Sequence, residues 1–137
     1  MKIVVDRYAW IELFRGSEKG VKVKELISNS TSVFVPDIVL AEIARKYIWE
    51  GYDENTVLQR LKWIVEVATP VQIDVEVAIA ASKCYMEIRN KTKCLKLSSP
   101  SLSDGIILAV ARIKEAKVVT GDKHFKDFEE TIWIGDY

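Results

Sequence analysis

Cysteine and histidine are scarce in this chain of 137 residues, which contains two cysteines and one histidine. Cys84 and Cys94 are not spaced as a CxxC pair, so we expect free thiols rather than a zinc or redox motif. A single histidine, His124, excludes sites built from two or three imidazoles, such as those of the HExxH zinc enzymes. Any catalytic chemistry is therefore expected to depend on carboxylates.

Long apolar runs, repeats and flexible linkers are also missing. No run approaches the roughly 20 apolar residues of a membrane-spanning helix, and 49% hydrophobic with 29% charged residues is ordinary for a globular domain. The first residues lack the pattern of a secretory signal peptide, so we expect a cytoplasmic protein without a membrane segment. Because no Pro/Gly-rich segment interrupts the chain, residues 1–137 are predicted to form a single domain.

The net charge is zero, so no overall field attracts a nucleic acid. Residues 83–126 nevertheless contain ten basic residues against four acidic ones. Such a block usually forms solvated helix faces, but it is also consistent with a track for a polyanion. The candidate contacts for a polyanion are Lys91, Lys93, Lys96 and Lys123.

Short apolar stretches alternate with segments of helical periodicity. Length and β-branched content predict buried strands at 2–5, 33–35, 71–73, 117–119 and 132–134. Helical patterns fill the intervals, at 10–14, 18–28, 36–49, 53–68, 74–90 and 101–111. This alternation predicts an α/β fold, namely a three-layer α/β/α sandwich with a mostly parallel five-stranded sheet.

The helical segment after Pro100 has no polar face. Ser101 is a suitable N-cap, and Asp104 stands where the first-turn amides and the helix dipole favour a carboxylate. Residues 105–111 are apolar around the whole circumference. We therefore expect this helix to be buried against the sheet.

Four acidic residues are candidates for one site. Asp6 directly follows the first strand and Asp122 follows the fourth, so a parallel sheet would bring both to the same edge. Asp104 opens the buried helix, whose N-terminus is expected to face that edge. Glu42 is a lone carboxylate among apolar neighbours, where burial without a partner would be costly.

Each of these acids also has a structural explanation. Asp6 and Asp122 could accept hydrogen bonds from turn amides, Asp104 could belong to a capping box, and Glu42 could pair with Lys46. If the acids converge, however, each pair at about 4 Å repels by about 1 kcal/mol in water and about 4 kcal/mol at an effective dielectric constant of 20. A divalent cation relieves this repulsion, and an all-oxygen ligand set selects Mg²⁺ or Mn²⁺. Such a site suits phosphodiester hydrolysis.

Four segments together resemble the PIN domain: 2–6, 36–42, 102–105 and 120–125. They span nearly the whole chain in order, and the chain is similar to the small prokaryotic VapC-type ribonuclease toxins. The resemblance implies Mg²⁺- or Mn²⁺-dependent endonucleolytic cleavage of RNA, steered by the basic residues named above. It also implies a homodimer and inhibition by a small antitoxin. The acidic catalytic and metal-binding quartet would be Asp6, Glu42, Asp104 and Asp122.

One position departs from the family pattern. Arg7 stands where the family commonly has a small hydroxyl residue, and its guanidinium could either pair with the quartet and weaken metal binding or hold the scissile phosphate. Thr120 keeps the hydroxyl that can orient a carboxylate. We expect Asp127 to face solvent and His124 to belong to the turn.

Two alternatives to the nuclease remain open. The first is a PIN-like domain that binds RNA or protein with a metal site impaired by Arg7. The second is a receiver-type phospho-accepting module, for which Asp74 is the available phosphoacceptor. A further hypothesis places Trp49 and Trp63 in a dimer face or an antitoxin groove.

Overall fold

The computed structural model describes residues 1–137 and contains one five-stranded sheet. The strand order is β3-β2-β1-β4-β5, and every neighbouring pair is parallel. The predicted α/β fold with a mostly parallel sheet is confirmed, and the sheet is parallel throughout. The strands are β1 (Lys2–Val5), β2 (Ser32–Pro36), β3 (Thr69–Val71), β4 (Lys117–Thr120) and β5 (Thr131–Trp133).

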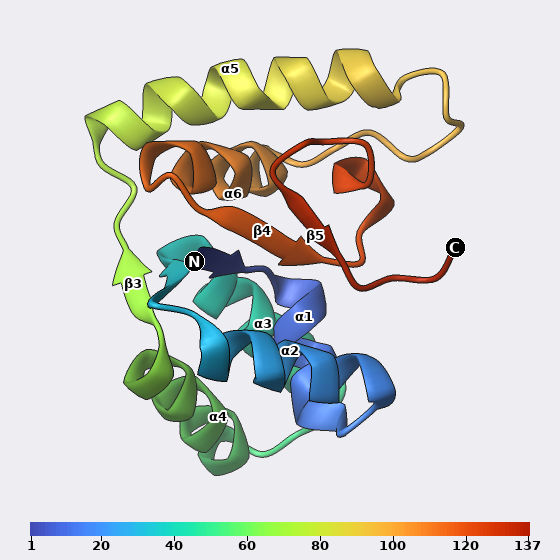
Figure 1. Ribbon diagram of the computed structural model, residues 1–137. Coiled ribbons are helices and arrows are strands. Elements are labelled where there is room, and N and C mark those ends of the chain that lie inside the picture. Colours follow the sequence, from blue (N-terminus) through green and yellow to red (C-terminus); the bar gives the residue numbers. More distant parts are fainter.

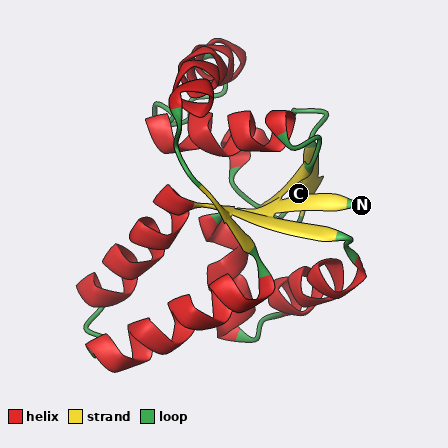
Figure 2. Cartoon of the chain, turned by 90° about the vertical axis from the view of Figure 1, so that its left-hand side faces the viewer, coloured by secondary structure: helices red, strands yellow, loops and turns green.

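Helices cover both faces of the sheet (Figure 2). One layer holds α6 against the sheet with α5 across its outer side, and α1 to α4 lie on the opposite side (Figure 1). No helix combines the length and the apolar composition that crossing a membrane requires. The helices are α1 (Arg7–Arg15), α2 (Glu18–Asn29), α3 (Asp37–Trp49), α4 (Glu54–Val67), α5 (Val75–Thr92), α6 (Leu102–Ile113) and the short 3-10 helix η1 (Lys123–Phe125).

The apolar segments form the core in the way that their patterns indicate. The side chains of β1 from Ile3 to Val5 are fully buried, as expected for a central strand covered on both faces. Helix α6 is buried from Asp104 to Ala111, so the prediction of a buried helix is confirmed. Because α5 covers the outer side of α6, even the face directed away from the sheet needs no polar residues.

The third strand lies two residues earlier than predicted. It spans Thr69–Val71 rather than 71–73, with Pro70 opposite Val35 of β2. A proline is tolerated there because β3 is an edge strand, and the missing N–H is not needed for a second neighbour. Ile73 is left exposed, and Asp74 becomes the N-cap of α5.

The order in which strands are added to the sheet reverses at β1, and this reversal determines where the candidate site lies. β2 and β3 extend from one side of β1, whereas β4 and β5 extend from the other. Val5 pairs with Val119, and the N–H of Asp6 donates to the carbonyl of Val119 at 3.3 Å. The carboxyl ends of β1 and β4 therefore meet at the switch point, where open α/β sheets form their sites.

Candidate active site

Asp6 is the most deeply buried acid at this edge, with 3% of its surface exposed. Its Oδ1 accepts a hydrogen bond from the N–H of Ala9 at 3.1 Å, and its Oδ2 accepts one from Thr120 Oγ1 at 2.5 Å. Burial raises the pKa of Asp6 to about 7, because these two hydrogen bonds offset only part of the desolvation and the charge of Asp122 adds to it. Asp6 thus lies near a second carboxylate in a pocket that disfavours negative charge.

Asp104 is held at the start of α6 by a capping box. Its Oδ2 accepts from the N–H of Ser101 at 2.9 Å, and its own N–H donates to Ser101 Oγ at 3.2 Å. Burial raises the pKa of Asp104, and the charge of Asp122 raises it further. Its other oxygen, Oδ1, makes no hydrogen bond in the chain. The cap explains the residue's position, yet it leaves one carboxylate oxygen available.

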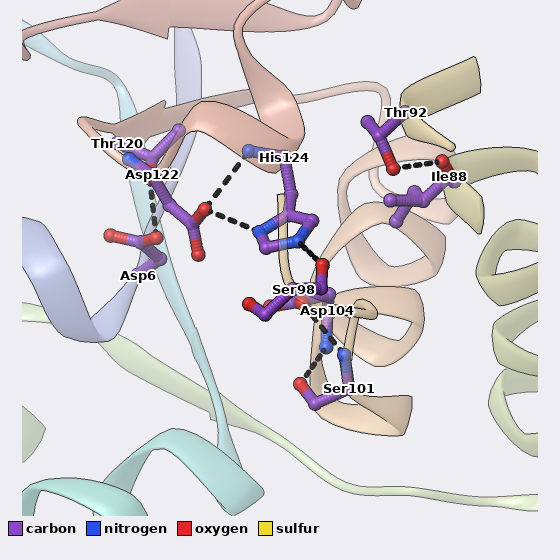
Figure 3. A network of polar contacts seen from close by, with 9 residues as sticks. All are labelled: Asp6, Ile88, Thr92, Ser98, Ser101, Asp104, Thr120, Asp122 and His124. Atoms are coloured by element: carbon purple, nitrogen blue, oxygen red, sulfur yellow. Dashed lines mark hydrogen bonds and ion pairs between the residues drawn. The ribbon is translucent and has the colours of Figure 1, made fainter. Parts of the chain in front are cut away.

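Asp122 lies near Asp104, in the turn that also contains His124, whose backbone N–H donates to Asp122 Oδ1 (Figure 3). Oδ1 of Asp122 contacts Nδ1 of His124 at 2.8 Å, and Nε2 of His124 contacts the carbonyl of Ser98 at 2.7 Å. Burial lowers the pKa of His124, but the hydrogen bonds to Ser98 and Asp122 outweigh it, so the net shift is upward. Both ring nitrogens face acceptors, which is the arrangement that suits an imidazolium.

The three side chains form one cluster of possible metal ligands. One ligand atom from each of Asp104, Asp122 and His124 lies within 4.8 Å of the others. His124 was expected only to belong to the turn, and it does lie in η1. Its contact with Ser98 depends on the path of a loop that is distant in sequence. The only feature of the sequence that points to His124 as part of the cluster is its position two residues after Asp122.

Glu42 has a different environment from the aspartates. The guanidinium of Arg7 contacts its Oε2 through Nη1 at 2.5 Å, and Ser103 Oγ donates to its Oε1 at 2.8 Å. The alternative in which Glu42 pairs with Lys46 is wrong, because Lys46 pairs with Glu50 at 2.9 Å. Both oxygens of Glu42 are thus engaged, by residues adjacent in sequence to Asp6 and Asp104.

Thr120 links two of the acid-bearing segments. Its hydroxyl donates to Asp6 Oδ2 and accepts from the N–H of Asp122 at 3.0 Å, and its side chain is fully buried. Since one hydroxyl sets the position of both segments, the carboxyl ends of β1 and β4 are held in a fixed relation. All four predicted acids therefore surround this edge, but Glu42 is already paired.

The four lysines predicted to contact RNA do not all lie beside the acids. Lys91 lies 4.3 Å from the ring of Phe128, whereas Lys93 follows α5 and Lys96 has a left-handed backbone with φ of 56°. Lys123 begins η1, directly after Asp122, and borders a cavity of about 350 Å³. Of the four, Lys123 is the one that adjoins the acidic cluster in the chain.

A second cavity, of about 330 Å³, opens beside Asp122. Arg7, Arg15 and Lys46 contribute positive charge to its wall, together with the ring of Tyr8. Sequence reasoning missed Arg15 and Lys46, because they lie in different helices and no local pattern joins them. Gly121 allows the close approach of Tyr8, since a Cβ there would lie 2.3 Å from the ring.

The donor set fits a divalent cation with oxygen ligands. Asp104 Oδ1 and Asp122 Oδ2 make no hydrogen bonds, and burial raises the pKa of Asp6 and of Asp104, so a bound cation would stabilise charges that water does not reach. Carboxylate oxygens favour Mg²⁺ or Mn²⁺ over softer metals. His124 already uses both ring nitrogens, so the aspartates are the more suitable ligands.

Two other acids do not belong to this cluster. Asp127 is exposed, which agrees with the expectation that it faces solvent. Asp74, the phosphoacceptor in the receiver-type alternative, caps α5 by accepting from the N–H of Val77 at 2.8 Å. The geometry thus concentrates the buried acids at a single edge of the sheet.

Comparison with known proteins gives a family and a fold. The family model described as PIN domain matches residues 3–130. Among curated protein sequences, none matches the chain significantly.

Several solved structures have the same fold. A toxin-antitoxin complex from Klebsiella pneumoniae has a TM-score of 0.71 at 17% identity, covering 98% of this chain and 99% of that one. VapBC2 from Rickettsia felis, bound to a DNA fragment from its promoter, has a TM-score of 0.68 at 17% identity, covering 97% of each chain. VapC20 from Mycobacterium tuberculosis, described as a sarcin-ricin loop cleaving toxin, has a TM-score of 0.60 at 15% identity, covering 85% of this chain and 86% of that one.

Proposed function

The chain belongs to the PIN domain family, and from this premise we propose that it is a divalent-metal-dependent endoribonuclease, the toxin of a toxin-antitoxin pair. The observation that carries the proposal is the convergence of Asp6, Asp104 and Asp122 at the switch point of the sheet. Their burial raises the pKa of two of them, and two oxygens are left without partners. A purely structural set of caps would not need two buried acids and a third, partly buried one around one point.

We assign the cation to Asp6, Asp104 and Asp122. A bound Mg²⁺ or Mn²⁺ would polarise a phosphoryl oxygen, lower the pKa of water and stabilise the leaving oxygen of the phosphodiester. Thr120 orients Asp6, and the capping box orients Asp104. His124 holds Asp122 through Nδ1, so that the remaining oxygen of that carboxylate faces the site.

Basic side chains around the acids would bind and steer the substrate. Lys123 adjoins the cluster on one side, and Arg7, Arg15 and Lys46 border the cavity on the other. Cations that flank an acidic centre can hold the phosphates next to the scissile one. RNA is the substrate that we favour, and the similarity in fold to an RNA-cleaving VapC toxin supports it.

The partners follow from the same similarity. Neighbours in fold are toxin-antitoxin complexes, which supports a small antitoxin as the partner of this chain. We further propose that the protein is a homodimer and that it acts on RNA in the cytoplasm. Trp49 is 89% exposed at the end of α3 and is the large apolar side chain that we expect in one of these interfaces.

Cleavage of RNA tests the proposal directly. The wild-type protein, incubated with end-labelled RNA, should cleave it with Mg²⁺ or Mn²⁺ and should stop when EDTA is added. Asp6→Asn and Asp104→Asn should each lower the rate by at least about 100-fold, as expected when an electrostatic catalytic group is lost. Asp127→Asn, which removes an exposed acid outside the cluster, is the matched control and should cleave at the wild-type rate.

Equal cleavage by all four proteins would show a contaminating nuclease or another site, and the proposal would be withdrawn.

One observation favours the second candidate, a PIN-like domain that only binds RNA or protein. The guanidinium of Arg7 already neutralises Glu42, as a metal ion would. If that pair impairs the metal site, the wild-type protein should bind no Mn²⁺ in calorimetry, whereas Arg7→Thr should bind it. Mn²⁺ binding by the wild-type protein would favour the nuclease.

A further inference from the structure

The pair formed by Arg7 and Glu42 differs from the rest of the acidic edge. Glu42 is buried and belongs to α3, and the partners of its two oxygens come from α1 and α6. Arg7 follows Asp6 in sequence, and Ser103 precedes Asp104. The pair therefore occupies one side of the site that the three aspartates define, and it holds a positive charge there.

A cation bound by Glu42 would have to lie close to the guanidinium. Arg7 Nη1 is 2.5 Å from Glu42 Oε2, and a Mg²⁺ ligand bond is about 2.1 Å long. A metal ion on that oxygen could thus be no more than about 5 Å from Nη1, where a divalent and a monovalent cation repel strongly in a partly buried site. The guanidinium thereby disfavours metal binding at Glu42.

No guanidinium contacts the aspartates, and His124 contacts only Oδ1 of Asp122. Asp104 and Asp122 each keep one oxygen without a hydrogen bond, and Asp6 is bound only by neutral donors, from Thr120 and the backbone. A guanidinium therefore neutralises Glu42, whereas the three aspartates have only the imidazole of His124 beside them, at one oxygen of Asp122. One divalent ion on the aspartates would complete the site.

The other edge of the guanidinium is free. Nη2 and Nε of Arg7 make no hydrogen bond in the chain, the side chain is 37% exposed, and it borders the cavity of about 330 Å³ that also reaches Asp122. A guanidinium held in place by a carboxylate, with a free pair of donors, suits a phosphate oxygen. Arg7 can thus contact the same phosphodiester that the aspartate site would act on.

We propose that the Arg7–Glu42 pair replaces a second metal ion: the site binds one divalent cation on the aspartates, and Arg7 supplies the second positive charge to the RNA phosphate. This inference rests on the proposed function and extends it to the number of metal ions. Glu42 is then a positioning residue for Arg7 rather than a metal ligand.

Mn²⁺ titration followed by electron paramagnetic resonance tests the proposal, because it counts bound ions without using activity. The wild-type protein and Arg7→Lys, which keeps the charge, should each bind one Mn²⁺. Glu42→Gln should also bind one, with a Kd within about threefold of wild type. Arg7→Gln should bind a second, weaker Mn²⁺, and adding Glu42→Gln to that variant should remove it.

Binding of a short single-stranded RNA in EDTA tests the phosphate contact. Arg7→Gln should weaken binding by at least about fivefold, and Arg7→Lys by less. Arg45→Gln, which removes an exposed arginine from α3, is the matched control and should bind as the wild type does. Circular dichroism confirms that each variant is folded.

The outcomes separate this inference from the proposed function. Two Mn²⁺ ions on the wild-type protein, or loss of its single ion in Glu42→Gln, would overturn the inference and leave the nuclease intact. RNA binding that is unchanged in Arg7→Gln would also overturn it. No Mn²⁺ on the wild-type protein, together with no RNA cleavage, would overturn both.

Discussion

At the scale of single residues, two of the three aspartates of the site, Asp6 and Asp104, are buried. Asp6 shows this most clearly, since burial raises its pKa to about 7 although two hydrogen bonds favour the charged form. A proton and a cation therefore compete for the same oxygens. This competition makes the site sensitive to pH near neutrality.

Metal affinity should weaken as the pH falls below about 7. Binding a cation to Asp6 displaces the proton that the buried carboxyl holds below its pKa, so the apparent Kd should rise by about tenfold per pH unit for one proton. Calorimetric Mn²⁺ titrations at pH 6, 7 and 8 measure this. An affinity that is constant over this range would show that Asp6 is not part of the site.

Without metal, the raised pKa of Asp6 makes the folded protein less stable as the pH rises, whereas metal affinity increases with pH. The folded protein holds a proton on Asp6 that the unfolded chain releases above the ordinary pKa of 3.8, so this contribution is present at low pH and is lost as the pH rises through about 7. Asp6→Asn mimics the protonated form, and in EDTA it should be more stable than wild type at pH 8, by on the order of a few kcal/mol. The difference should shrink at pH 5, measured by urea unfolding.

The sequence predicts the position of these acids better than their partners. That Asp6 and Asp122 lie at the same edge follows from the parallel sheet, because Asp6 comes directly after β1 and Asp122 two residues after β4. The contact of His124 with Ser98 could not be predicted, because it depends on the path of the loop between α5 and α6. The sequence indicates that Arg7 could pair with the quartet but not with which acid, because that depends on how close α1 lies to α3.

At the scale of elements, α6 contributes to both the site and the core. Its N-terminus positions Asp104, and the helix is buried in the core from Gly105 to Ala111. Its capping box fixes Asp104, and the next residue, Gly105, lies against the backbone of α5. A Cβ on Gly105 would lie 2.4 Å from the carbonyl oxygen of Ala81. The close contact of these two helices therefore requires a residue without a side chain.

Gly105→Ala should destabilise the protein by about 1–3 kcal/mol, because the helices must move apart to admit the methyl group. Ser82→Ala, a change of similar size at an exposed position of α5, is the control and should stay within about 0.5 kcal/mol. Chemical unfolding in EDTA measures both. Equal stability of the two variants would show that the helices do not pack as closely as described.

The apolar periodicity predicts the order of the strands and α-helices, since strands and helices of this length differ clearly in their periods, but η1 was expected to be a turn. The first helix, expected at 10–14, begins at Arg7, because Asp6 is its N-cap. The third strand was placed two residues too late, because Pro70 reads as a strand boundary when the strand's edge position is unknown. Whether a strand lies at the edge or in the centre of a sheet depends on the whole sheet and not on the local sequence.

At the scale of the whole molecule, one of the four tryptophans lies almost fully on the surface. Trp49 is 89% exposed, whereas Trp63, the other tryptophan expected at an interface, packs edge-on against Trp10 with centroids 6.2 Å apart. The two tryptophans thus have different environments, although they lie on neighbouring helices. Trp49 is therefore the more accessible of the two to a second chain.

Trp49→Ser should lower association with a second copy or an antitoxin without changing stability, because an exposed side chain contributes little to the core. Trp63→Ala should instead lower stability by about 3 kcal/mol or more, as loss of a packed tryptophan does. Light scattering and thermal unfolding distinguish the two effects. An unchanged mass and an unchanged capture of antitoxin by Trp49→Ser would remove Trp49 from any interface.

The central claim is that distant aspartates form one cation site at the edge of the sheet. The most direct measurement is the anomalous scattering of Mn²⁺ in crystals of the protein. We expect a single peak between Asp6, Asp104 and Asp122 that disappears in Asp104→Asn. Crystals at saturating Mn²⁺ with no peak at this position, or with peaks only elsewhere, would contradict the claim.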